Sequence, residues 1–139
     1  MIRTGEQFDL LAWSPPETVA AFDPQMIRAK SYGGRLSRAI SVSLDGCGYS
    51  RAEIAARMSE HMGRTIRLTI LNAYASVARD THAISVTRVN ALISATGDRR
   101  LLEFVAADHG FSVIDSRYLP MIALAAVPDH TPGLYRKER

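Results

Sequence analysis

The chain has 139 residues, of which 47% are hydrophobic and 22% charged, and its formal net charge is +3. These values are ordinary for one globular domain that is large enough to bury a core. No apolar run approaches the roughly 20 residues of a membrane span, so we expect no membrane contact. The first residues lack a signal-peptide pattern and the lone Cys47 cannot form an intrachain disulfide, which together favour the cytoplasm.

The first 32 residues show no sustained hydrophobic period and are expected to form an N-terminal arm. An apolar cluster at residues 8–13 precedes two prolines, and residues 17–26 could form a short helix. Residues 1–27 are acidic on balance, so we do not expect the arm to touch DNA. The arm either packs on the domain or binds a partner.

Two helices are predicted next. The first follows Gly33-Gly34 and has apolar residues at helical spacing from Leu36 to Cys47. The second begins with an S-x-x-E capping box at Ser50 and Glu53, in which each side chain satisfies an amide at the helix start. It runs from about residue 51 to 62 and ends at Gly63. Its core-facing side is expected to comprise Ile54, Ala55, Met58 and Met62.

A third helix is expected over residues 68–79, with Tyr74 as a core anchor. One face carries the apolar residues Leu68, Leu71, Ala75 and Ala78. The opposite face offers Arg67, Thr69, Asn72, Ala73 and Ser76 to solvent or DNA.

Two further helices are predicted, the fourth capped by Ser85 and the fifth capped by Asp98 and reaching Gly110. Residues 111–114 alternate and could be extended. A last helix has Pro120 in its first turn, and residues 129–139 are expected to be disordered. The fold class is therefore all-α: an N-terminal arm (1–32), a domain of about five short helices (33–114), and a C-terminal helix with a tail (115–139).

The second and third helices, joined by a glycine-containing turn, form a helix-turn-helix pattern. The positive charge lies in the same region, because residues 28–67 contain eight basic side chains against three acidic ones. A phosphate-binding surface requires this coincidence, so the pattern favours duplex DNA as the partner. The basic residues are Arg28, Lys30, Arg35, Arg38, Arg51, Arg57, Arg64 and Arg67.

The order of these elements resembles the λ-repressor-like DNA-binding fold. A more specific likeness lies in residues 95–102 (ATGDRRLL) and 107–111 (ADHGF), because the ending "TGD-x-x-LL … G-F" after a helix-turn-helix is similar to the phage CII-type regulatory proteins. The likeness covers residues 34–114. It implies a cytoplasmic DNA-binding regulator of phage or prophage genes. One departure is that the segment from Ser59 to Ile66 is several residues longer than in the common helix-turn-helix pattern.

Candidate DNA contacts follow from side-chain chemistry. Arginine and asparagine can make paired hydrogen bonds to base edges in the major groove, and Arg51 at the start of the second helix could hold a phosphate. The four histidines form no metal-binding pair, and no catalytic constellation is evident, so we expect neither an enzyme nor a cofactor. The candidate contacts are Arg51, Arg64, Thr65, Arg67, Thr69, Asn72 and Ser76.

Partners other than DNA remain open. Two half-sites usually need a dimer, for which the apolar segment Tyr118–Leu124 is the candidate contact, and simple packing on the domain is its alternative. Another regulator or RNA polymerase is a further candidate partner. The competing functional class is a helical protein-interaction module without DNA binding, with residues 8–27 as a docking arm.

Overall fold

The computed structural model of the protein describes residue 14 and residues 16–79 and 83–126. Within these residues every regular element is helical and there is no strand, which confirms the all-α class. The chain divides into two compact units, one of residues 19–113 and one of residues 1–18 together with 114–139. The expectations for the apolar cluster at 8–13 and the tail at 129–139 lie outside the described residues.

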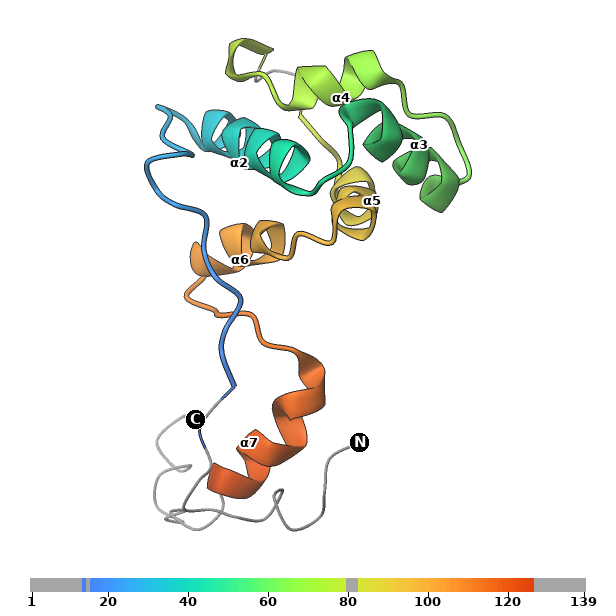
Figure 1. The fold of residues 1–139 in the computed structure, drawn as a ribbon. Coiled ribbons are helices and arrows are strands. Elements are labelled where there is room, and N and C mark those ends of the chain that lie inside the picture. The colour runs from blue at the N-terminus through green and yellow to red at the C-terminus, as the bar shows by residue number, and fades with distance from the viewer. Residues whose placement is uncertain (1–13, 15, 80–82, 127–139) are drawn as a thin grey trace. The chain divides into compact units, whose positions relative to one another are not determined.

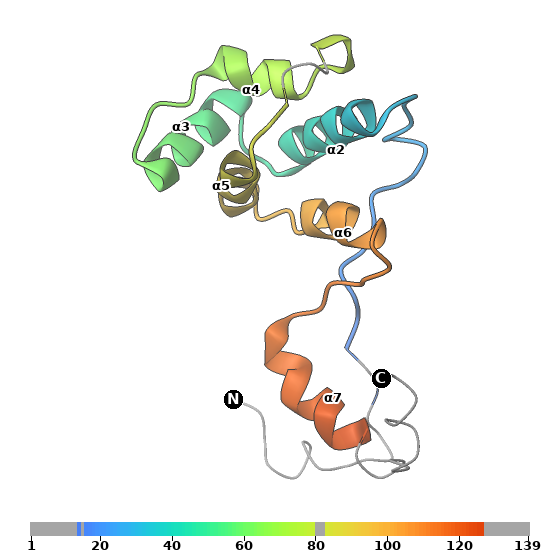
Figure 2. The same cartoon turned by 180° about the vertical axis from the view of Figure 1, so that it is seen from behind.

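The described residues of the larger unit form five α-helices and one 3-10 turn, which Figures 1 and 2 show from opposite sides. In chain order these are α2 (Tyr32–Gly46), α3 (Arg51–Met62), α4 (Leu68–Tyr74), η1 (Val77–Arg79), α5 (Val86–Thr96) and α6 (Arg100–Ala107). The other unit contains η2 (Ser116–Tyr118) and α7 (Leu119–Ala126). No helix in the described residues is both long and apolar enough to span a membrane.

Short-range signals set both ends of α3 and of α5. Ser50 and Glu53 form the predicted capping box, and the Ser85 hydroxyl accepts a hydrogen bond from the Arg88 amide at the start of α5. Gly63 and Gly97 end α3 and α5 with φ of 66° and 72°. This left-handed conformation is strained for residues with a Cβ, so glycine fits both ends.

The core is organised around α3, which packs most extensively on α5 and also contacts α2 and α4. Its buried face is the predicted one, and Met62 is partly buried beside it. The buried core residues of these two helices are Ile54, Ala55 and Met58 from α3, and Ala91, Leu92 and Ala95 from α5.

The N-terminal segment belongs partly to this core. The Phe22 side chain is only 2% exposed, and the Val19 amide donates a 2.8 Å hydrogen bond to the Val113 carbonyl. Residues 17–26 form no helix; a turn follows Asp23 instead. The compact unit therefore begins at Val19 rather than at residue 33, because a buried aromatic ring ties the segment to the helices.

The helix α4 is shorter than expected and is turned about its axis. It ends at Tyr74 rather than near residue 79, and η1 follows. Leu71 and Tyr74 are buried as expected, but Ala73 is also buried and Leu68 is 41% exposed. Leu71 thus lies at one edge of the buried arc instead of its centre, which brings Asn72 to the middle of the exposed arc.

Asp98 and Arg100 form a local cluster at the start of α6. The carboxylate accepts hydrogen bonds from the Arg100 backbone amide and from its guanidinium, and that guanidinium lies 4.5 Å from the Phe22 ring centre. Arg99, not Asp98, occupies the cap position. The buried Ser43 hydroxyl has no hydrogen-bond partner at bonding distance, but it lies near enough to Asp98 to favour its charged form. Burial alone would raise the pKa of Asp98, but these bonds outweigh it and lower that pKa.

We expect Phe22→Ala to destabilise the larger unit by about 3–5 kcal/mol, the usual cost of removing a buried phenyl ring. Urea unfolding measures this. The control is Met26→Ala, since Met26 is 55% exposed and its truncation should change stability by no more than about 0.5 kcal/mol. Equal effects of the two substitutions would show that Phe22 is not part of the core.

Stability should also depend on the charge of Asp98. Folding lowers the pKa of the Asp98 carboxyl. The contribution of this group to folding stability is therefore complete above its ordinary pKa of 3.8, and is lost as pH falls through the folded-state pKa. Asp98→Asn should therefore be less stable than the wild type at neutral pH, and the difference should shrink in acid. Thermal unfolding between pH 7 and pH 3 measures it; a pH-independent difference would contradict the charge effect.

Candidate nucleic-acid interface

The exposed arc of α4 and the segment before it bring most of the predicted contact residues to the surface. Thr69 and Asn72 are exposed on α4, and Arg67 is exposed at its N-cap. Arg64 and Thr65 are exposed in the connection from α3. Ser76 differs, because it is partly buried beyond the end of α4.

The connection between α3 and α4 spans residues 63–67 and is held to α3 by Ser59. The Ser59 hydroxyl accepts a 2.7 Å hydrogen bond from the Ile66 amide and lies 2.7 Å from the Ala55 carbonyl, to which it can donate. The Ile66 side chain is 4% exposed and fills the core beneath the connection. The connection between the two helices is therefore anchored at Ile66, through its backbone amide and through its buried side chain.

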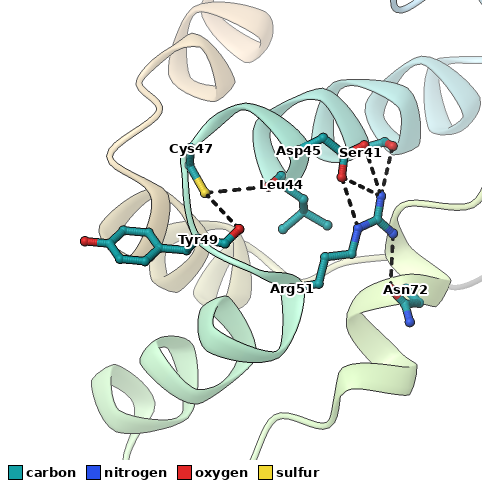
Figure 3. A network of polar contacts seen from close by, with 7 residues as sticks. All are labelled: Ser41, Leu44, Asp45, Cys47, Tyr49, Arg51 and Asn72. Atoms are coloured by element: carbon teal, nitrogen blue, oxygen red, sulfur yellow. Dashed lines mark hydrogen bonds and ion pairs between the residues drawn. The ribbon is translucent and has the colours of Figure 1, made fainter.

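Arg51 begins α3 and is engaged by both neighbouring helices (Figure 3). Its Nε and Nη2 atoms donate to Asp45 near the end of α2, and Nη2 lies 3.3 Å from Ser41 Oγ. Its Nη1 atom donates a 3.1 Å hydrogen bond to Asn72 Oδ1. The sequence analysis predicted that Arg51 could bind a phosphate. In the structure its guanidinium already has an anionic partner, the Asp45 carboxylate.

The remaining arginines of the helix pair differ in availability. Arg57 Nε donates to the Ala95 carbonyl at 3.1 Å, and the guanidinium lies 4.4 Å from the Tyr49 ring centre. Arg64 and Arg67 have no ion-pair partner among the described residues. Among the arginines of this helix pair, the two without a described acidic partner therefore lie before and at the start of α4, near Thr65 and Thr69.

Two further residues of this site, Ser41 and Asp45, were not predicted from the sequence. They are four residues apart and lie on one face of α2, so their spacing was visible, but nothing local indicates that Arg51 would reach them. Within the described part of the chain, no group of His, Cys, Asp and Glu side chains is placed to hold a metal ion.

Comparison with known protein families, with curated proteins and with solved structures gave no significant match for this chain. The likeness to λ-repressor-like and CII-type regulators therefore stays an expectation from the sequence.

Proposed function

We propose that this protein is a sequence-specific, double-stranded DNA-binding transcriptional regulator of phage or prophage type. In this proposal α3 and α4 form a helix-turn-helix, and α4 enters the major groove with Asn72 and Thr69 toward the base edges. The observation that carries the proposal is the exposed arc of α4, where polar side chains lie beside two arginines that no described acidic residue neutralises.

The distribution of charge supports a division of labour within this surface. Arg64 and Arg67 project from the connection and the N-cap, where they can bind phosphates on either side of a groove. The guanidinium of Arg51 is less suited to a phosphate, because Asp45 lies 3.1 Å from it. We therefore assign phosphate binding to Arg64 and Arg67, and recognition of base edges to Asn72.

Asn72→Ala is expected to cost about 1–3 kcal/mol of binding on the preferred duplex and much less on random duplex, as loss of one base contact does. The preferred duplex is first obtained by selection from genomic fragments, and affinities are measured by fluorescence anisotropy. The side chain is exposed, so the fold should be unaffected. Equal losses on both duplexes would remove Asn72 from base reading.

The matched control is an arginine on the same surface. Arg67→Gln should weaken both duplexes to a similar degree and flatten the dependence of log K on log salt by about one unit, because one phosphate contact is lost. Arg99→Gln, an exposed arginine at the start of α6, should leave both quantities unchanged.

The alternative is a helical protein-interaction module, which the apolar surface of α6 favours. Leu102 and Val105 are 44% and 46% exposed, and Phe111 after the helix is 70% exposed. Failure to select any duplex, with no effect of Asn72→Ala or Arg67→Gln on binding to random DNA, would make this module the leading account.

We also propose a homodimer formed through α7, since a small major-groove reader usually occupies two half-sites. This helix has no buried residue, and Leu119 and Leu124 are 52% and 53% exposed. Sedimentation at tens of micromolar should give a dimer for the full chain and a monomer for Leu119→Glu combined with Leu124→Glu. A monomeric wild type would contradict the dimer.

A further inference from the structure

The guanidinium of Arg51 joins three helices at one point, which Figure 3 shows from close by. Every nitrogen of the group donates within the domain: to Asp45 and Ser41 of α2, and to Asn72 of α4. Two of these nitrogens approach the same carboxylate, with contacts of 3.1 to 3.4 Å. A forked contact of this kind fixes the orientation of a guanidinium as well as its place.

Fixing the guanidinium also fixes the Asn72 amide. An arginine can only donate hydrogen bonds, so the amide must turn its oxygen, not its nitrogen, toward Nη1. The amide nitrogen then points away from Arg51, as Figure 3 shows. An isolated exposed asparagine could adopt either orientation, whereas this contact selects one.

The hydrogen-bonding capacity that remains on Asn72 matches one base. Arg51 uses one lone pair of Oδ1, which leaves the second lone pair and the two N–H donors. Adenine presents an N7 acceptor beside an N6 amino donor in the major groove, and an asparagine amide binds that pair with its nitrogen and oxygen together. Guanine, with two acceptors at the same edge, cannot satisfy the oxygen.

We propose that Arg51, held by Asp45, is a positioning residue that orients the Asn72 amide to select adenine at one position of the bound duplex. This inference rests on the proposed function. It gives Arg51 a role in selectivity rather than in phosphate binding, because its charge is already paired and its donors are directed into the domain.

The test compares Arg51→Met, which removes the donors but keeps an unbranched apolar stem, with Arg67→Met as the matched control. The measured quantity is the ratio of affinities for duplexes with adenine or guanine at the position read by Asn72. Arg51→Met should reduce an adenine preference of about tenfold to less than about threefold, with the salt slope unchanged. Arg67→Met should keep the preference and lower the slope by about one.

Two further variants connect this effect to the network. Asp45→Asn weakens the fork at a mostly exposed residue and should reduce the same preference. In the Asn72→Ala background, Arg51→Met should have no further effect on the base ratio, because the two residues act as one unit. An unchanged adenine preference in Arg51→Met, or a reduced salt slope for it, would overturn the proposal.

A measurement without DNA separates this inference from the proposed function. In ¹⁵N NMR of the free full-length chain, the Asn72 side-chain amide should be ordered in the wild type and mobile in Arg51→Met, with the fold of each variant checked by thermal unfolding. Equal mobility in both proteins would overturn the positioning role even if DNA binds. An ordered amide in a protein that binds no duplex would instead overturn the proposed function, and the base-reading role with it.

Discussion

The packing of α3 against α5 is the interaction on which the rest of the larger unit depends. The fully buried side chains of Ile54 and Met58 on α3, and of Leu92 on α5, belong to one core cluster. Because α3 is fixed there, its first residue can join α2 to α4, and its last turn can anchor the connection that carries Arg64 and Thr65. Loss of this packing would disperse every element of the proposed interface.

Buried contacts support the exposed arc of α4 from within the domain. Tyr74, the last residue of α4, is buried and its hydroxyl accepts a hydrogen bond from Arg88 of α5, while the Ser59 hydroxyl accepts one from the Ile66 amide. The seven residues of α4 are too few for a stable isolated helix, so tertiary contacts must supply its order. Such support limits the orientations that the exposed Asn72 and Thr69 can present to a ligand.

Charge is arranged in two ways on this surface. Arg51 and Arg57 are engaged by groups of the domain itself, whereas Arg64 and Arg67 have no described acidic partner. Net charge alone does not distinguish these roles, because all four residues contribute equally to the count of basic side chains. In the proposed interface, therefore, Arg51 and Arg57 stabilise the domain, and Arg64 and Arg67 are the arginines available to a ligand.

The sequence by itself determined α3 and α5, because residues close in sequence set the ends of both helices. These residues are the Ser50–Glu53 capping box, Ser85, and the left-handed glycines Gly63 and Gly97. These signals act within about four residues, so they can be recognised in the sequence without knowing the fold. Likewise, the sequence alone located the exposed Asn72 and its neighbouring arginines. It could not set the rotation of α4, which is decided by the helices that cover it.

Only the tertiary structure decided that Phe22 lies in the core, that Ala73 is buried, and that Arg51 reaches Asn72 across 21 residues of sequence. The physical reason is the same in each case. Burial of a residue, and contact between side chains far apart in sequence, depend on which surfaces pack together. Because the hydrophobic effect is non-directional, a short stretch of sequence does not show which surfaces these are.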